Sequence, residues 1–328
     1  MKRVRVSVLS EMETFRRVQT GFDERNFMAV SIGNWKRREP GETSLAWLLV
    51  MPSLVLIMGI KLYPLAYSVI LSFQKMSVLS PNAKFVGFDN YARLLSNPSF
   101  ISAFGHTLYF TVVSLVIQVI LGIIVALALN QEFAGRNLVR AIVLLPWAVP
   151  TVVNALLWQW IYHPQYGVLS GILFKLGIID GPVQWLGDAR LAMNMVIIAD
   201  TWKTLPLYII MFLAALQTVP AELHQAAEID GANARQRFFN VTLPFLMPTM
   251  VVVLVLRTME AFRVFDVIYL MTGGGPGGST TVVGYYAYLE AFRNLNFSSG
   301  AAASNTIVVT VAAISFLYMR LLRSRAFD

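Results

Sequence analysis

The sequence predicts an all-α, polytopic membrane protein: a bundle of six transmembrane helices with both ends of the chain in the cytoplasm. Three observations predict this class. The chain has 328 residues, of which 56% are apolar and only 13% are charged, whereas ordinary globular domains carry about 25% charged residues. Its mean hydropathy of +0.61 is typical of integral membrane proteins. Six segments also reach the roughly 17–25 residues that a membrane-spanning helix needs.

The six predicted spans differ in their polar residues and prolines. The first contains Lys61 and Pro64, so we expect either two helical pieces or an outer half that leaves the bilayer. The third contains Pro146 and Pro150 and is expected to kink, because proline removes a backbone hydrogen bond that neighbouring groups must replace. The spans are residues 45–73, 107–129, 138–161, 191–216, 243–270 and 301–322.

The distribution of Lys and Arg predicts the orientation of these spans. With the N-terminus inside, the cytoplasmic segments, counted together with Arg140 and Arg320 at the inner ends of their spans, hold sixteen of the 26 basic residues, outer segments hold six and the remaining span positions hold four. Because cytoplasmic segments carry the excess of basic residues, this count places both termini inside the cell. It also places the polar segment 220–248 on the cytoplasmic face.

The regions outside the spans divide the chain further. Residues 1–42 are predicted to be a cytoplasmic extension, either partly disordered or lying on a surface, with an amphipathic helix as the alternative; residues 43–328 form the transmembrane domain, with a core at about 104–320. No apolar stretch follows the first basic residues closely enough to predict a signal peptide. The outer loops 74–104 and 162–190 carry aromatic residues that suit either an extracytoplasmic partner or the membrane interface. These residues are Phe85, Phe88, Tyr91, Tyr166 and Trp185.

Composition and motifs argue against several other classes of function. The absence of cysteine excludes disulfides and thiol chemistry. The three histidines are far apart, and no pattern of a metal site or a catalytic centre is present. A net charge of +8 does not indicate nucleic-acid binding, because the basic residues flank the apolar segments instead of forming one patch. The glycine-rich stretch 273–280 lacks the lysine of a phosphate-binding loop, so a flexible outer loop or helix break is expected there.

The cytoplasmic segment 220–248 predicts a short helix, a turn and a second helix. Pro220 suits the first turn of a helix, and Glu222 suits its positive end. Asp230 and Gly231 are expected to break this helix, with Gly231 providing the bend and Asp230 able to cap the next helix. The second helix carries Arg235, Arg237, Phe238 and Phe239, and Pro244 and Pro248 bracket the return to apolar sequence.

Ionisable residues within the spans are costly in hydrocarbon and therefore informative. Asp200 and Lys203 are three residues apart on one helix face, so they could form a pair. In the fifth span Arg257, Glu260, Arg263 and Asp266 recur every three residues and are expected to form one polar stripe that faces the bundle interior. Two interpretations stay open: ion pairs that fix helix packing, or a route for a hydroxyl-rich solute. A substrate pathway would consist of Arg257, Glu260, Arg263, Asp266, Tyr269, Asn154 and Trp158.

The cytoplasmic segment QAAEIDGANARQRFFNVTLPFLMP resembles the EAA signature of bacterial ABC importer permeases. Two further stretches are similar to the carbohydrate branch, the MalF-like sugar permeases: Trp202–Lys203 with Pro206, and an FD-x-IY…TGGGP block that begins at Phe265. The three blocks occur in order, and the resemblance covers about residues 46–320. In the signature, the matching residues are Ala226, Ala227, Asp230, Gly231, Ala232, Phe238, Leu243, Pro244 and Pro248, whereas Gln225 replaces the usual first Glu.

The resemblance implies a mechanism and a set of partners. The signature would form a coupling helix between spans 4 and 5 that lies in a cleft of a separate ATPase subunit. Because Gln225 carries no charge, any ion pair expected at this position is weakened, and the coupling contact would depend more on shape. This chain would bind no cofactor and would not be an enzyme, because ATP and Mg²⁺ would be bound by the ATPase. The expected partners are a second homologous permease, two ATPase subunits, an extracytoplasmic sugar-binding protein and the bilayer of the bacterial cytoplasmic (inner) membrane, but not nucleic acid.

Substrate is the least determined feature of the sequence. The stretch RTMEAFRVFDVIYLMTGG most resembles permeases for disaccharides or short oligosaccharides such as trehalose or maltose. Glycerol phosphate esters and acidic oligosaccharides such as alginate remain alternatives, because Arg257 and Arg263 could bind an anion. A stand-alone secondary transporter, which would be expected to contain internal repeats, and a membrane scaffold protein are the competing functions.

Overall fold

The computed structural model describes residues 40–77 and 80–326, and the predicted extension 1–42 lies almost wholly outside them. The chain divides into two compact units after Leu65. In the first unit, α3 (Pro40–Ile57) continues through a π-helical turn, η1 (Met58–Leu62), which contains Lys61. The second unit contains most of α4 (Tyr63–Ser72) and all later elements. The first predicted span is therefore a continuous helical run with a local π-helical turn, not two pieces.

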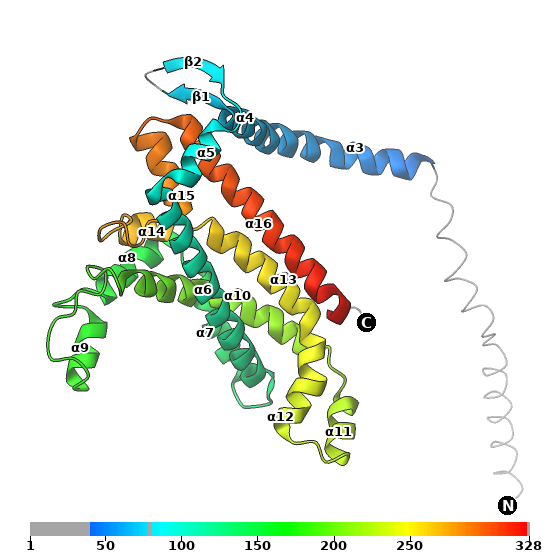
Figure 1. The fold of residues 1–328 in the computed structure, drawn as a ribbon. Coiled ribbons are helices and arrows are strands. Elements are labelled where there is room, and N and C mark those ends of the chain that lie inside the picture. Colours follow the sequence, from blue (N-terminus) through cyan, green and yellow to red (C-terminus); the bar gives the residue numbers. More distant parts are fainter. Residues whose placement is uncertain (1–39, 78–79, 327–328) are drawn as a thin grey trace, which may run out of the picture. The chain divides into compact units, whose positions relative to one another are not determined.

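Four long helices form the body of the second unit (Figure 1). The helix α6 (Pro98–Asn130) packs along α10 (Ala192–Leu216), and α13 (Leu243–Phe262) packs against α16 (Phe297–Ala326). A Cβ atom at Gly122 of α6 would lie 3.1 Å from the Phe212 ring of α10. The absence of a side chain at Gly122 therefore lets these two helices approach closely.

Five helical segments among the described residues are long and apolar enough to cross a membrane, or six if one bent pair counts as a span. This pair is α7 (Arg136–Ala148) and α8 (Thr151–Ile161), which meet at 98°. Pro146 lies in the last turn of α7, and Pro150 directly precedes α8. The predicted kink is confirmed in position, and it is sharp enough to make two separate helices.

The fifth predicted span, 243–270, is wrong at its C-terminal end. The helix α13 ends at Phe262, the chain turns at Arg263, and a separate short helix, α14 (Asp266–Met271), follows. Asp266 in the first turn of α14 stabilises the new helix, because a carboxylate there interacts favourably with the free backbone N–H groups. The polar residues of the predicted stripe are consequently distributed over two helices and the turn between them.

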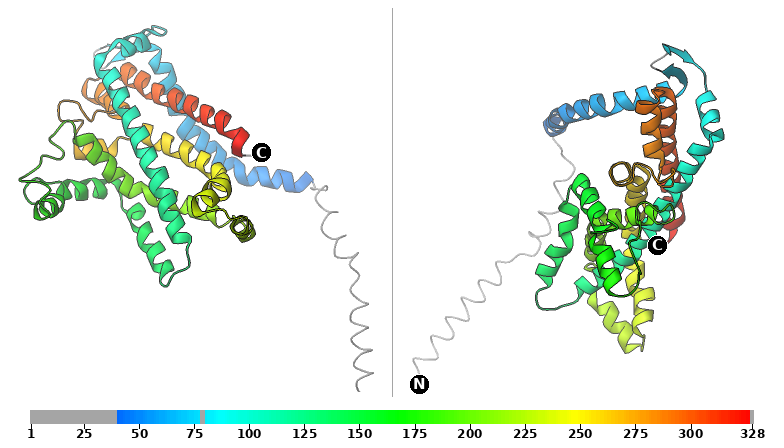
Figure 2. Two further views of the ribbon diagram at one scale, coloured as in Figure 1. Left: turned by 60° about the horizontal axis from the view of Figure 1, so that its bottom comes forward. Right: turned by 90° about the vertical axis from the view of Figure 1, so that its left-hand side faces the viewer.

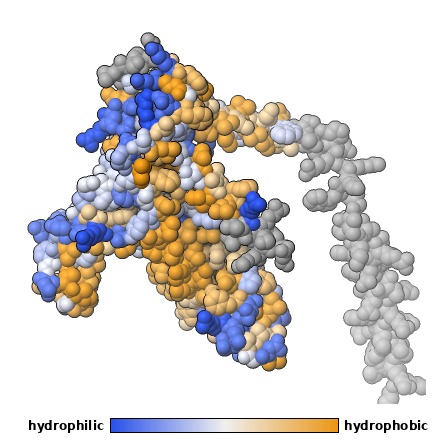
Figure 3. Space-filling view, in the orientation of Figure 1, coloured by the Kyte–Doolittle hydropathy of each residue, from blue (hydrophilic) through white to orange (hydrophobic). Residues whose placement is uncertain are grey.

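Several of the shorter elements lie at the two ends of the second unit (Figures 1 and 2). One end carries a β-hairpin and α5, and the other carries α11 and α12. Figure 3 shows hydrophobic residues over the middle of the bundle and hydrophilic residues near both of these ends, as expected for a membrane-spanning body. The bounds are β1 (Gln74–Ser77), β2 (Ser80–Phe85), α5 (Asp89–Ser96), α9 (Val168–Lys175), α11 (Ala221–Ile229), α12 (Ala234–Arg237), η2 (Phe238–Thr242), α15 (Val283–Tyr288) and η3 (Leu289–Arg293).

The aromatic residues of the predicted outer loops fall into two groups. Phe85, Phe88 and Tyr166 are exposed. Trp185 is buried, and its Nε1 donates a hydrogen bond to Ser170 Oγ at 2.8 Å. Tyr91 packs beside Phe73, and its hydroxyl lies 2.8 Å from Ser72 Oγ. Only the first group is available to a partner.

The antiparallel hairpin of β1 and β2 is an addition to the predicted all-α fold.

The glycine-rich stretch 273–280 is a loop that breaks the helical sequence between α14 and α15, as expected. Its two ends are joined by the hydroxyls of Thr272 and Thr280, whose oxygens are 2.7 Å apart. The Thr280 hydroxyl also contacts the Gly275 carbonyl oxygen at 2.8 Å. The loop is therefore closed by its own hydrogen bonds.

Candidate functional site

A polar cleft of about 370 Å³ lies between α10 and α13 in the second unit. All four members of the predicted stripe, Arg257, Glu260, Arg263 and Asp266, line it. The cleft also contains residues that the stripe did not include, although Lys203 and Asp200 stood out in the sequence. These are Phe110, Thr151, Asp200, Lys203 and Thr204, and Val264, Phe265 and Val267 complete the lining.

The central contact of the cleft is an ion pair between its two walls. Arg257 Nη2 donates to Asp200 Oδ2 at 2.6 Å, and the two side chains are only 2% and 14% exposed. The guanidinium carbon of Arg257 also lies 5.7 Å from the centre of the Phe110 ring. The expected pair of Asp200 with Lys203 is therefore wrong, because Asp200 turns toward a cation on a different helix. Arg257 supports the helix-packing interpretation of the stripe.

Further polar contacts link the helices around the cleft. The Tyr208 hydroxyl of α10 donates to Glu260 Oε2 of α13 at 2.6 Å. Gln118 Nε2 of α6 donates to Thr204 Oγ1 at 2.6 Å, and Thr204 Oγ1 donates in turn to the Asp200 carbonyl oxygen at 2.8 Å. Three helices are thus linked around the cleft, as polar side chains within a bundle require hydrogen-bond partners.

Three charged side chains of the cleft remain available to a ligand. Lys203, Arg263 and Asp266 form no ion pair with another residue in the part of the chain that the structure describes. Arg263 and Asp266 are exposed, and Lys203 is half-buried. The lining contains three cations and three carboxylates, so its formal charges balance.

An aromatic cluster borders the cleft. Phe265 lines the cleft, and its ring stacks on Tyr269 with a centroid distance of 5.4 Å. Tyr288 of α15 contacts both rings, at 5.2 Å from Phe265 and 5.6 Å from Tyr269. Tyr269 is 46% exposed, so part of its side chain is available beside the polar cleft. The cluster consists of Phe265, Tyr269, Tyr285, Tyr288 and Phe292.

Three predicted pathway residues do not line the cleft: Tyr269, which belongs to the aromatic cluster at its border, and Asn154 and Trp158. Asn154 is buried, and its Nδ2 donates to the Ala199 carbonyl oxygen at 3.3 Å. The Trp158 ring packs between Tyr162 and Trp202, at centroid distances of 5.1 and 5.9 Å. Both residues therefore connect α8 to α10. The cleft residue Thr204 was overlooked although it lies one helical turn after Asp200, whereas nothing in the sequence points to Phe110 or Thr151.

The predicted coupling segment forms a helix, a glycine turn and a second helix at the far end of the bundle. Gly231 has φ +77°, its N–H donates to the Glu228 carbonyl, and the Ala232 N–H donates to the Ala227 carbonyl. These two bonds form a Schellman motif, in which glycine tolerates the left-handed conformation. The bend predicted at Gly231 is confirmed. The capping residue expected for the second helix is wrong, because Asn233 caps α12 in a capping box with Gln236 while Asp230 ends α11.

The surface of this segment combines small and apolar groups. Ile229 is 86% exposed, and Arg235 lies over the exposed Phe239 ring at 5.9 Å. Gln225, Ala226, Asp230, Gly231 and Pro244 are exposed, while Ala227, Ala232, Phe238 and Leu243 are half-buried. An exposed apolar side chain among small residues suits close contact with another protein.

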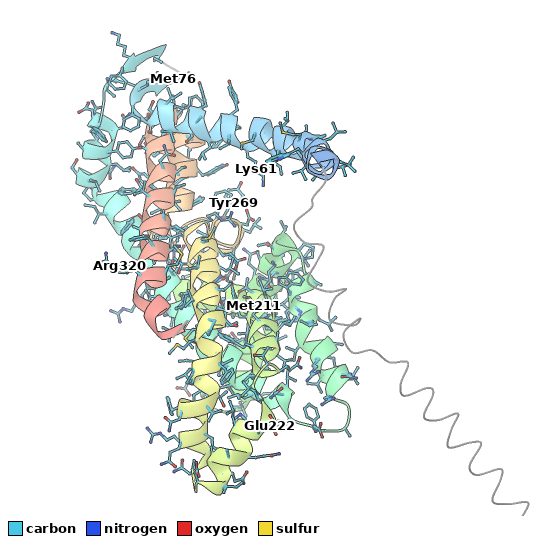
Figure 4. The ribbon with its side chains drawn as sticks, turned by 90° about the vertical axis from the view of Figure 1, so that its right-hand side faces the viewer. Lys61, Met76, Met211, Glu222, Tyr269 and Arg320 are labelled. Atoms are coloured by element: carbon cyan, nitrogen blue, oxygen red, sulfur yellow. The ribbon has the colours of Figure 1, made fainter. Side chains whose placement is uncertain are left out.

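The helices beside this segment lead directly to the cleft. Helix α10 precedes α11, and the run from Ala234 to Phe262 is helical through α12, η2 and α13. Figure 4 shows Glu222 of α11 at one end, Tyr269 toward the other end and Met211 of α10 between them. Both walls of the polar cleft are therefore parts of the helices that hold the α11–α12 turn.

Comparisons with known proteins agree with this architecture. Residues 118–327 match the family described as "Binding-protein-dependent transport system inner membrane component". The trehalose/maltose transport system permease protein MalF of Thermococcus litoralis is 40% identical over 285 residues, which cover 87% of this chain and 95% of the relative. The sulfoquinovosyl glycerol transport system permease protein SmoG of Agrobacterium fabrum is 35% identical over 87% of this chain and 92% of the relative.

A solved structure gives the same fold. The chain resembles a subunit of a bacterial ABC transporter involved in the import of the acidic polysaccharide alginate, with a TM-score of 0.75 and 25% identity over 87% of this chain and 96% of that chain. The protein is thus a multi-pass inner membrane protein with a transport and not a catalytic role. From the family match over more than half of its length and the 40% identity to a permease, this chain belongs to the binding-protein-dependent transport system inner membrane components, the permease subunits of ABC transporters.

Proposed function

We propose that this chain is the permease subunit of an ATP-driven ABC importer that moves a neutral sugar. The favoured substrate is a disaccharide or short oligosaccharide of the trehalose or maltose type. The observation that carries the proposal is the charge-balanced polar cleft with an aromatic cluster at its border. Aromatic rings cover the apolar faces of a sugar, and polar side chains bond its hydroxyls. The cleft volume of about 370 Å³ lies within the range of small-molecule sites.

The charges of the cleft favour a neutral over an acidic substrate. Relatives are named for both kinds, including sn-glycerol-3-phosphate for the permease UgpA of Agrobacterium fabrum. Arg257 is already paired with Asp200, and the free cations Lys203 and Arg263 share the cleft with Glu260 and Asp266. A site for an anion needs an excess of positive charge, and this cleft has none. Glycerol phosphate esters and acidic oligosaccharides such as alginate are therefore the second candidates.

The helix α11 is proposed to couple transport to ATP hydrolysis on a partner. Its exposed Ile229, with the small side chains of Ala226 and Ala227, would enter a groove of an ATPase subunit. Gln225 carries no charge, so the contact would rest on shape more than on electrostatics. ATP and Mg²⁺ would bind to the ATPase, and this chain would need no cofactor.

The connection of α11 to the cleft supports this role. From Ala234 to Arg257 the continuous helix rises about 35 Å, at 1.5 Å per residue. A displacement of the α11–α12 turn would move α13 on one side and α10 on the other, and these helices form the two walls of the cleft. Closure of the ATPase pair would thereby exchange inward-open and outward-open states.

The complete transporter would contain a second homologous permease, two ATPase subunits and an extracytoplasmic sugar-binding protein. The α11–α12 end would face the cytoplasm, and both termini would lie inside. The hairpin end of the second unit would then face outward and receive the binding protein.

Reconstitution tests this function directly. The chain is placed in proteoliposomes with its partner permease and ATPase pair, and uptake of labelled trehalose or maltose is measured with and without ATP and binding protein. We expect uptake to require both. Labelled glycerol 3-phosphate and an alginate oligosaccharide serve as anionic comparisons, and the anions should not be imported.

Each alternative function gives a different result. Uptake by this chain without ATP would identify a stand-alone secondary transporter. Preferential uptake of the anionic substrates would overturn the neutral-sugar assignment while keeping the importer. Unchanged uptake in cells that lack the chain would indicate a scaffold role.

A further inference from the structure

A second cavity, of about 700 Å³, lies at a different place in the second unit. Its walls are the first turns of α6, the loop 277–281, and the helices α15 and η3. The lining is mostly polar and includes Asn97, Ser102, His106, Ser279, Glu290 and Asn294. Ser279 Oγ is buried and has no hydrogen-bond partner among the described residues. We call this cavity the α6–α15 cavity.

The α6–α15 cavity is separate from the polar cleft. No residue lines both of them. Along α15 and η3, Tyr288 and Phe292 contribute to the aromatic cluster beside the polar cleft, whereas Tyr286, Glu290 and Asn294 line the cavity. These two helices therefore stand between the cavity and the proposed route of the sugar.

The cavity carries a single acidic charge. Among the described residues that line it, Glu290 is the one carboxylate and there is no Lys or Arg. Glu290 Oε1 accepts a hydrogen bond from Asn294 Nδ2 at 2.9 Å, which fixes the side chain but does not neutralise it. Burial and, second, the charge of Glu290 raise the pKa of Tyr286, whose ring lines the same cavity. His106 Nδ1 lies 3.1 Å from the Thr281 carbonyl oxygen, to which it donates.

One rim of the cavity is open to close approach. Gly277 and Gly278 are exposed and have φ +59° and +86°. A Cβ atom at Gly277 would meet nothing within 4 Å. Another polypeptide can therefore lie directly against the backbone of this rim, which the hydrogen bonds of Thr272 and Thr280 hold in place.

The cavity is poorly suited to a sugar. The Tyr286 ring, which lines it, is 6% exposed and packs against Phe100 with a centroid distance of 5.6 Å. It offers no free ring face for stacking. Glu290 has no ion-pair partner among the described residues, and a carboxylate of this kind beside an open backbone rim is instead complementary to a basic side chain on a protein surface.

We propose that the α6–α15 cavity is a docking site for a Lys or Arg side chain of the extracytoplasmic binding protein, with Glu290 as its electrostatic partner. This inference rests on the proposed function, which makes the hairpin end of the bundle the outward one. The first turns of α6 and the helix α15 lie toward this end, away from α11 and α12 (Figures 1 and 2).

Glu290→Gln is the central variant of the test. Gln keeps an oxygen that accepts from Asn294, so the substitution removes the charge while it preserves the local contact. The control is Asp180→Asn, because Asp180 is an exposed carboxylate after α9 that does not line the cavity. The reconstituted transporter is titrated with the sugar-loaded binding protein that stimulates ATP hydrolysis by the wild-type complex, and the half-saturating concentration and maximal rate are measured.

We expect Glu290→Gln to raise the half-saturating concentration of binding protein about fivefold, the effect of roughly one charge pair, with the maximal rate unchanged. Glu290→Lys should raise it further, and Asp180→Asn should leave it unchanged. Added salt should weaken docking to the wild type more than to Glu290→Gln, because salt screens the pair.

Two results would overturn the docking site alone. One is an unchanged half-saturating concentration in both Glu290 variants. The other is a changed dependence on sugar concentration at saturating binding protein, which would make the cavity a sugar subsite. A wild-type transporter that no sugar-loaded binding protein stimulates would overturn the proposed function and, with it, this inference.

Discussion

Arg257 of α13 donates a hydrogen bond to the carboxylate of Asp200 of α10 across 2.6 Å, although the two residues are 57 positions apart in the sequence. Their helices emerge from opposite sides of the α11–α12 turn. The pair therefore links the two walls of the polar cleft, and its Arg257 side chain is buried, with only 2% of its surface exposed. A charge buried in this way is strongly destabilising when it loses its partner.

Breaking this ion pair should destabilise the protein more than removing it whole. We expect Arg257→Met or Asp200→Leu alone to lower the free energy of unfolding by about 3–5 kcal/mol, because each leaves one uncompensated buried charge. The double variant should recover most of this loss. The free energy of unfolding is measured in mixed micelles for the purified wild type, the two single variants and the double variant. Additive effects of the two substitutions would show that the residues do not interact energetically.

The Gly231 turn gives a prediction about coupling. Gly231→Pro cannot adopt φ +77°, because proline fixes φ near −65°, and it also loses the N–H that donates to Glu228. We expect sugar-stimulated ATP hydrolysis and uptake to be lost while membrane insertion and subunit assembly persist. Gly231→Ala should cost only about 1–2 kcal/mol locally.

A helical glycine far from the turn is the matched control. Gly105 of α6 has open space around its Cβ position, so Gly105→Ala should leave both uptake and assembly intact. Normal sugar-stimulated ATP hydrolysis in Gly231→Pro would count against a coupling role for this segment.

Local sequence signals predicted the α11–α12 segment well, because its structure depends on neighbouring residues. The Gly231 turn closes with bonds that reach at most five residues back. The capping box of Asn233 and Gln236 is equally local and readable in the sequence, although the predicted cap is Asp230.

The cleft was harder to predict, because its contacts join distant segments. A three-residue spacing favoured Lys203 as the partner of Asp200, whereas the fold provides Arg257. The end of α13 at Phe262 has no sequence signal either, since no glycine or proline occurs from Thr249 to Thr272. The four residues of the predicted stripe nevertheless line the same cleft on both sides of the break, although Arg263 and Asp266 are exposed and do not face the bundle interior.

Arg263 and Glu260 should separate transport from packing. Arg263 is exposed and has no ion-pair partner among the described residues, so Arg263→Gln should not change the free energy of unfolding by more than about 0.5 kcal/mol. Glu260→Gln keeps an oxygen for the Tyr208 hydroxyl and should assemble normally. We expect both variants to reduce sugar uptake severalfold, because in the proposed pathway each would lose a charged group that bonds sugar hydroxyls.

The control for these variants is Arg190→Gln, which removes an exposed cation outside the cleft and should leave uptake unchanged. Uptake and the yield of assembled complex are measured on the same membranes. Reduced assembly with normal transport per complex would favour a role of Arg263 and Glu260 in packing alone.

Tyr269 tests whether the aromatic cluster contacts the sugar. Its ring stacks on Phe265 and is 46% exposed beside the cleft. Tyr269→Ala should raise the sugar concentration for half-maximal transport about fivefold to tenfold, since a stacked ring contributes roughly 1 kcal/mol. Tyr269→Phe keeps the ring and should stay within about twofold of the wild type.

Because sugar normally arrives on the binding protein, the effect of these variants on sugar affinity is best measured as direct binding to the purified permease pair. Phe316→Ala, which removes an exposed ring from α16, is the matched control and should have no effect on sugar binding. Equal affinities of Tyr269→Ala and the wild type would place the sugar outside the cluster and restrict its site to the polar cleft.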